Sequence, residues 1–124
     1  MGATAKSIEM VFEAWKIRQI KPQICRLTSD RKDLIRVRLG LGYEPSDFIA
    51  VIEYMFESME SDAKWMRGEN PRKKRYLDLS NLLRKEKLAG RVEAALLWQM
   101  DKGSSTADLD DDFGPFRLIR GGNQ

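Results

Sequence analysis

The sequence predicts an all-α protein, a small bundle of about five helices followed by a flexible C-terminal tail. Apolar residues recur at the three- and four-residue spacing of a helix face in several separate stretches. No stretch alternates apolar and polar residues as a half-buried strand does, and no segment is repeated. With 124 residues, of which 42% are hydrophobic, the chain is long enough for one domain with a modest core.

The first predicted helix occupies SIEMVFEAWKIRQIK, residues 7–21. Ser7 is the expected N-cap, because a serine hydroxyl accepts a hydrogen bond from the first helical turn. Pro22 ends the helix, since proline cannot continue the backbone hydrogen bonding. The residues of its apolar face are Ile8, Val11, Phe12 and Trp15.

The second predicted helix is capped by Thr28 or Ser29. Asp30 lies in its first turn, where its negative charge interacts favourably with the positive end of the helix dipole. Gly40 and Gly42 are expected to supply the left-handed residues that end it. Its apolar side consists of Leu27, Leu34, Ile35 and Leu39. Its remaining surface is basic and carries Arg31, Lys32, Arg36 and Arg38.

The third predicted helix begins at Ser46, the expected N-cap, with Asp47 just inside it. It is the most hydrophobic helix, and we expect it at the centre of the core. Its apolar stripe consists of Phe48, Ile49, Val51, Ile52, Met55, Phe56 and Met59.

A loop is predicted over residues 67–72, because Gly68 and Pro71 interrupt helical regularity. Trp65, just before it, is expected to anchor in the core. A short leucine-rich helix near residues 78–85 and a last helix over about 86–100 follow. Gly90 weakens that helix by roughly 1 kcal/mol relative to alanine. The residues expected to pack inward from it are Leu88, Val92, Ala95, Leu96 and Trp98.

The composition changes after Met100, where DKGSSTADLDDD is polar and reads as a linker. The predicted division is therefore a helical domain over residues 1–100 and a flexible acidic and aromatic tail over residues 101–124.

The residue types argue against an enzyme. The chain has no histidine and one cysteine, Cys25, which excludes a zinc finger and the Ser–His and Cys–His nucleophile systems. Asp30 and Asp33 lie three apart among basic residues, so surface pairing explains them better than acid–base catalysis. We expect no metal and no cofactor. A lone cysteine and the lack of an apolar run of about 18 residues favour a soluble, cytoplasmic protein without a membrane partner.

The formal net charge is only +3, but the charges are segregated. Residues 16–38 and 64–91 are basic, residues 44–62 are acidic, and the tail is acidic. The basic segments are candidates for phosphate contacts, with Trp65 or Tyr76 as stacking residues. The alternative is that these charges only solvate helix surfaces.

The tail contains LDDDFGPF, residues 109–116, which joins an acidic run to two phenylalanines. Charge that steers and aromatics that anchor are typical of a short docking motif. The segment resembles the acidic tip of bacterial single-strand-binding proteins, but RLIRGGNQ follows it here. The alternatives are a disordered tail or one that folds back on the domain. The residues of this tail motif are Asp110, Asp111, Asp112, Phe113 and Phe116.

Three segments together resemble a known family. They are VFEAW (11–15), DRKDLIRVRLGLGYEPSDFIAVIE (30–53) and WMRGENPRKKRYLDLSNLLR (65–84). The chain resembles, over residues 8–98, the conserved C-terminal domain of bacteriophage and prophage replication proteins of the replisome-organiser, helicase-recruiting type. The usual N-terminal winged-helix DNA-binding domain of those proteins has no counterpart in this sequence, so origin recognition is not carried over. The matching positions are Phe12, Trp15, Arg36, Arg38, Leu39, Gly42, Tyr43, Asp47, Gly68, Asn70, Arg72, Arg75, Tyr76 and Leu79.

The resemblance implies a DNA-replication accessory protein that acts by binding in the cytoplasm of a bacterial host cell. Its partners would be the replicative helicase or the helicase loader, with single-stranded DNA as a further partner. Two alternatives stay open: a stoichiometric inhibitor of a host defence or replication system, and a small DNA-binding regulator built on the basic second helix. The candidate binding residues are Arg36, Arg38, Arg72, Lys73, Lys74 and Arg84.

Some of the residues in the 65–79 segment have structural roles that chemistry predicts. Gly68 permits a positive φ angle, and the side chain of Asn70 can satisfy loop backbone groups. Arg75 is expected to form a forked interaction with Asp78 or Glu69. The remaining loop residues, Tyr76 and Leu79, are expected to pack the loop onto the core. Lys73 and Lys74 are then left as the outward contacts.

Overall fold

The structure, a computed structural model, describes the backbone of residues 4–111 and the side chains of residues 4–102. Within this range the chain is all-α, as predicted, with a short 3-10 helix and no strand. The helices are α1 (Ala5–Lys16), η1 (Pro22–Ile24), α2 (Ser29–Leu39), α3 (Pro45–Glu57), α4 (Ser61–Met66), α5 (Leu79–Leu82) and α6 (Lys85–Asp111).

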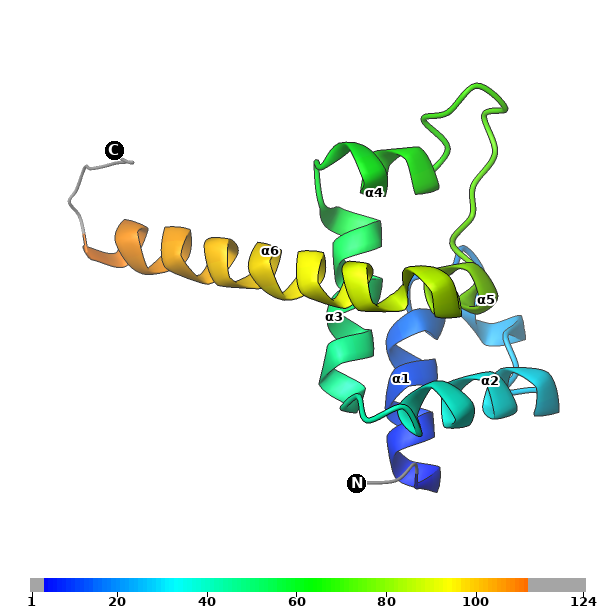
Figure 1. Ribbon diagram of the computed structural model, residues 1–124. Helices are drawn as coiled ribbons and strands as arrows, with labels where there is room; N and C mark the ends of the chain where they lie inside the picture. Colours follow the sequence, from blue (N-terminus) through cyan, green and yellow to red (C-terminus); the bar gives the residue numbers. More distant parts are fainter. Residues whose placement is uncertain (1–3, 112–124) are drawn as a thin grey trace.

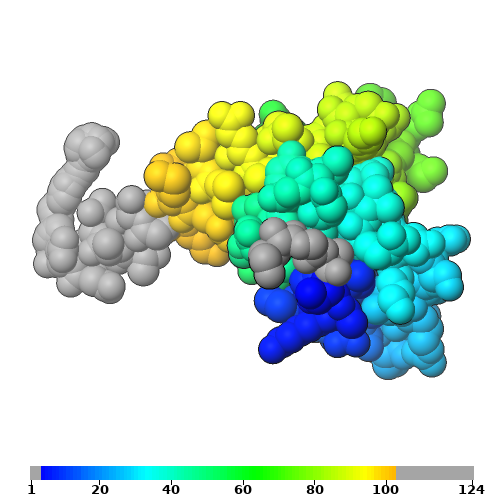
Figure 2. All heavy atoms as spheres, turned by 60° about the horizontal axis from the view of Figure 1, so that its bottom comes forward, coloured from blue at the N-terminus to red at the C-terminus, as the bar shows by residue number. Residues whose placement is uncertain are grey.

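Helix α3 is the centre of the fold, as its hydrophobic stripe predicted. It packs against α1, α4, α5 and α6, and α2 packs against α1 and α5 (Figure 1). Phe48, Val51 and Ile52 of α3 have no exposed surface, whereas Met59, which was predicted to continue the stripe, lies beyond the end of the helix and is exposed. Figure 2 shows α1, α2 and α3 forming one continuous surface, with α6 beside α3.

Two of the three predicted N-caps are wrong. Helix α1 is capped by Thr4, and Ser7 is the third helical residue, which hydrogen-bonds back to Thr4. Helix α3 is capped at Glu44 rather than Ser46, because Pro45 is already suited by its fixed φ to the first helical position. The carboxylate of Asp47 accepts a hydrogen bond from the Glu44 N–H at 2.9 Å. Thr28 caps α2, as predicted.

The turn after α2 uses one of its two glycines in the left-handed region. Gly42 has a φ of 109°, but Gly40 has a φ of −63° and remains right-handed. Only Gly42 therefore has the role that the sequence predicted for both.

Helix α6 is longer than predicted. The sequence predicted that it ends near residue 100, but the backbone continues as helix to Asp111. Once a helix is nucleated, each further residue adds a hydrogen bond at little cost, so a polar sequence can extend it. Of the tail motif, Asp110 and Asp111 lie in α6 but their side chains are outside the described set, and Asp112, Phe113 and Phe116 lie outside the described residues. The tail motif and the division of the chain at residue 100 stay predictions.

Candidate nucleic-acid interface

The segment from Arg67 to Asp78 leaves the body after α4 and returns to α5 (Figure 1). Asn70 holds this loop together from its centre. Its amide nitrogen donates to the carbonyls of Trp65 and Lys74, both at 2.7 Å, and its amide oxygen accepts from the Lys74 N–H at 3.2 Å. Gly68 has a φ of 114° at the turn. The predicted roles of Gly68 and Asn70 are therefore confirmed.

Two further hydrogen bonds tie the returning half of the loop to the helices. The Tyr76 N–H donates to the Met66 carbonyl at 2.8 Å, and the buried indole N–H of Trp15 donates to the Leu77 carbonyl, also at 2.8 Å. Leu79 is 2% exposed, and Tyr76 packs half-buried against the core. The loop is thus fixed to α4 and to α1, so its side chains have defined directions.

Arg75 does not form the predicted fork. It has no hydrogen bond or ion pair with another described residue, and the two expected partners are engaged elsewhere. Glu69 lies 3.9 Å from the ammonium of Lys64. Asp78 accepts from Ser80 and Asn81; burial raises the pKa of Asp78, but these hydrogen bonds outweigh burial and hold the pKa below its usual value.

Trp65 is not the core anchor that the sequence predicted. It lies in α4, a helix that the sequence analysis missed, whose buried face consists of Ala63 and Met66. Trp65 therefore points outward, is 45% exposed, and stacks on Tyr76 with ring centroids 5.2 Å apart and planes at 13°. The ammonium of Lys74 lies 5.6 Å from the centre of the Tyr76 ring.

The stacked Trp65 and Tyr76 rings line a groove of about 880 Å³ between α4, the loop, α5 and the first turns of α6. Four of the charged residues that line it are basic, and one is acidic. The basic residues are Arg72, Arg84, Lys87 and Arg91, and the acidic residue is Asp62. A groove with four cations, one anion and an aromatic ledge suits an anionic ligand that also has flat rings.

Arg91 and Asp62 form the structural part of this groove. Arg91 donates to the carbonyls of Asn81 and Leu82. Burial lowers the pKa of Arg91, and the nearby positive charge of Arg84 lowers it further. Asp62 accepts a hydrogen bond from the Tyr54 hydroxyl at 2.6 Å. Burial together with this carboxylate raises the pKa of Tyr54, so Tyr54 stays neutral.

The remaining groove cations are available to a ligand. Arg72 and Lys87 are exposed and donate no side-chain hydrogen bond to another described residue. Arg84 is exposed and lies 3.5 Å from Glu86, a surface pair of the kind that contributes little to stability. These three side chains can neutralise phosphates without breaking a buried interaction.

The structure separates the sequence-predicted binding residues into two groups. Arg72 and Arg84 line the groove, Lys74 lies over Tyr76, and Lys73 is exposed with a left-handed φ of 54°. Arg36 and Arg38 do not line it. Arg36 pairs with Asp33 at 2.8 Å on α2, and Arg38 donates to the Leu83 carbonyl at 2.7 Å, which is a structural role.

Two groove residues were missed by the sequence analysis. Lys87 and Arg91 are four residues apart in α6, a spacing that places both on one helical face, and Arg84 is the residue just before this helix. This periodicity was visible in the sequence. What the sequence did not indicate is that the Trp65–Tyr76 stack lies opposite that face.

No protein-family model, curated protein or solved structure matches this chain. Among the described residues, no cluster of three or more metal-ligating side chains occurs. No helix in the same part of the chain is both long enough and apolar enough to cross a membrane.

Proposed function

We propose that this chain is a bacteriophage or prophage DNA-replication accessory protein that acts by binding, and that the groove holds single-stranded DNA. The single observation that supports the DNA contact is the convergence of Arg72, Arg84 and Lys87 on the Trp65–Tyr76 stack. The replication role rests on the family resemblance of residues 8–98.

The form of the groove favours single-stranded over duplex DNA. A base must be unstacked before its face can lie on an aromatic ring, and the exposed Trp65 ring offers such a face. Stacking of one base on an aromatic residue contributes about 1–3 kcal/mol to binding. Three phosphate-contacting cations predict a salt slope of about −2, at about 0.7 per contact with a single strand.

The alternative of a regulator that binds DNA through α2 has less support. Arg36 pairs with Asp33, and Arg38 donates to Leu83. Arg31 donates to the Arg26 carbonyl at 2.7 Å, and its guanidinium lies 4.8 Å from the centre of the Trp15 ring. Arg31 and Arg38 thus donate to backbone carbonyls, whereas the exposed Arg36–Asp33 pair contributes as little as the Arg84–Glu86 pair. Helix α2 therefore leaves only Arg36 and Lys32 for a ligand.

Fluorescence anisotropy with a labelled oligothymidine tests the groove. Because Arg72 and Lys87 are expected to contact phosphates, the double variant Arg72→Gln/Lys87→Gln should weaken binding roughly tenfold and reduce the salt slope by about 1.4. Trp65→Ala should weaken binding by about 1–3 kcal/mol without changing the slope.

The matched control is Lys32→Gln, which removes an exposed lysine of α2 outside the groove. Its affinity and salt slope should equal those of the parent. If the Lys32 variant loses as much affinity as the groove variants, binding follows either overall charge or the α2 surface, and the groove assignment is wrong.

A further inference from the structure

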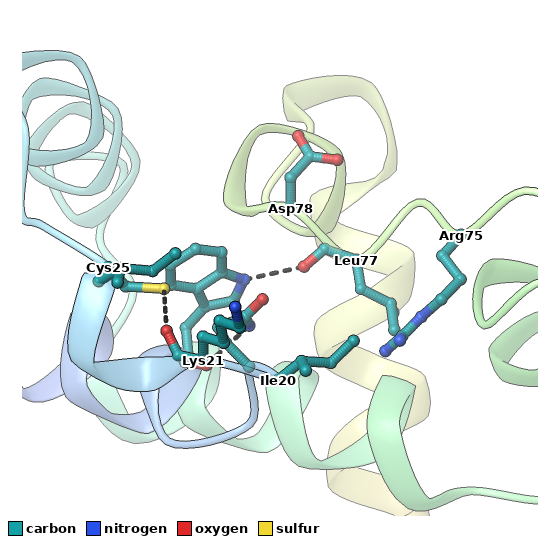
Figure 3. Close-up of a pocket in the computed structure, with 9 residues that line it drawn as sticks. Ile20, Lys21, Cys25, Arg75, Leu77 and Asp78 are labelled. Atoms are coloured by element: carbon teal, nitrogen blue, oxygen red, sulfur yellow. Dashed lines mark hydrogen bonds between the residues drawn. The ribbon is translucent and has the colours of Figure 1, made fainter.

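A second depression lies on the opposite side of the loop from the groove. Its volume is about 490 Å³, and it is bordered by the turn between α1 and α2 and by the returning half of the loop. In Figure 3 the side chains of Ile20, Leu77 and Arg75 point toward one another, while Asp78 points away. Neither the proposed DNA contact nor the family resemblance explains this depression.

The apolar residues around the depression are unusually exposed. Ile20 is 84% exposed and Ile24 is 67% exposed, and both line the depression; Ile17, one turn earlier, is 66% exposed. Single apolar residues on a surface are ordinary, but two strongly exposed isoleucines at one depression are typical of a contact surface.

The charges of the depression are unbalanced in favour of cations. Lys21 and Arg75 line it, and neither makes a side-chain ion pair with another described residue. Its one carboxylate, Asp78, is occupied by Ser80 and Asn81. An apolar floor with free cations is complementary to a peptide that carries large apolar side chains next to carboxylates.

The chain itself contains such a peptide. Residues 110–116, the acidic–aromatic segment, read DDDFGPF and combine three aspartates with two phenylalanines. We propose that the depression docks the acidic–aromatic segment of a second copy of this chain. Phe113 and Phe116 would bury Ile20 and Ile24, and the aspartates would face Lys21 and Arg75.

Chain length favours a second copy over the chain's own segment. Helix α6 has 27 residues, which gives a length of about 40 Å, and it runs from α5 to the far side of the molecule (Figure 1). The segment from Asp111 to Phe116 spans at most about 18 Å. It therefore cannot return from the end of α6 to a depression that lies beside the start of α6.

The far part of α6 offers a second copy additional apolar contact. Leu97 is 55% exposed and Met100 is 66% exposed, and the three-residue spacing places both on one side of the helix. An exchange in which each copy docks its segment on the other is reciprocal, so it closes a symmetric dimer.

Light scattering coupled to gel filtration of the full chain tests the proposal. The parent should dimerise with rising concentration, and Ile20→Asp and Phe113→Ala/Phe116→Ala should both shift it to monomer. A mixture of the two variants should associate again, because one supplies the intact depression and the other the intact segment. Met59→Asp is the control: Met59 is 74% exposed and lies outside the depression, so this variant should dimerise like the parent.

A fluorescein-labelled peptide of residues 108–118 provides the second measurement. It should bind the full-length Phe113→Ala/Phe116→Ala chain, and adding Ile20→Asp should weaken that binding at least about tenfold. A parent that stays monomeric at high concentration overturns the proposal, even if the peptide binds. A dimer that both variants leave intact overturns it as well.

Discussion

The four basic residues from Arg72 to Arg75 follow one another in the sequence, yet their side chains have four different surroundings. Arg72 lines the groove, Lys73 is exposed at a left-handed position, Lys74 lies over Tyr76, and Arg75 lines the opposite depression. The turn at Arg72 and the left-handed φ of Lys73 change the chain direction within the run. A run of like charges therefore need not form one patch.

Gly68 gives a prediction at the scale of one residue. Its φ of 114° is strained for any residue with a Cβ, and a Cβ added there would lie 3.4 Å from Cγ of Arg75. Gly68→Ala should lower the free energy of unfolding by about 1–3 kcal/mol. Urea denaturation measures this loss.

Gly90 is the matched control for Gly68. It lies in α6, where an added Cβ meets nothing within 4 Å. Gly90→Ala should raise the free energy of unfolding by roughly 0.5–1 kcal/mol, because alanine loses less backbone entropy in a helix. Equal effects of the two substitutions would show that the φ angle of Gly68 has no cost.

At the scale of helices, Glu57 joins three of them. It is the last residue of α3, and its carboxylate accepts from Arg18, just beyond α1, and from Lys102 of α6 at 3.1 Å. The carboxylate lies at the negative end of the α3 dipole, where the two cations offset an unfavourable position. Burial raises the pKa of Glu57, but the hydrogen bonds from Arg18 and Lys102 outweigh burial and lower the pKa below its usual value.

The lowered pKa of Glu57 predicts a pH dependence. A carboxyl whose pKa is lower in the folded chain stabilises it above the unfolded pKa, near 4.5, and this contribution is lost as the pH falls through the folded value. Glu57→Gln should therefore reduce the free energy of unfolding at pH 7 by about 0.2–1 kcal/mol and make it less sensitive to acid. Urea denaturation at several pH values measures both effects.

Glu13→Gln is the control for Glu57, because Glu13 is exposed on α1 and makes no side-chain ion pair with another described residue. It should change neither the stability at pH 7 nor the pH dependence. A loss at pH 7 that persists undiminished at pH 3 for Glu57→Gln would contradict the assigned role of the carboxylate.

At the scale of the whole molecule, the loop divides two surfaces. The groove on one side is basic and aromatic, and the depression on the other is apolar with a cationic rim. Lys73 lies at the tip between them, and neither surface includes it. The two proposed ligands, single-stranded DNA and the acidic–aromatic segment of a second copy, would therefore occupy separate surfaces.

Charge reversal at the loop tip tests the proposed partner. Lys73→Glu/Lys74→Glu should weaken co-purification with the replicative helicase or its loader, or binding of single-stranded DNA, because both side chains are exposed. Circular dichroism should show the parent's helicity, since no core contact is removed. A double variant that binds both the helicase and DNA like the parent would contradict the proposal that Lys73 and Lys74 contact a partner.

The sequence alone determined the helical class and most of the core. Ile8, Val11, Phe12 and Trp15 recur at helical spacing and are all buried, because periodicity is a local property that a helix converts directly into a face. The roles of Gly68 and Asn70 were also predictable, since a turn that needs a positive φ and a side-chain bridge restricts residue type at those positions. Helix caps were less predictable, because each helix start offers two polar residues within one turn. These are Thr4 and Ser7 at α1, and Glu44 and Ser46 at α3.

The tertiary structure alone decided what the charged and aromatic residues face. The sequence predicted that Trp65 anchors in the core. Ala63 and Met66 fill the buried side of α4 instead, so Trp65 points outward and stacks on Tyr76. The sequence predicted a phosphate contact for Arg38, but its guanidinium donates a hydrogen bond to the carbonyl of Leu83, 45 residues later. Lys87 and Arg91 became groove residues only when α6 packed opposite the loop. Contacts between residues far apart in the chain depend on how helices pack, and no local pattern of residue types contains that information.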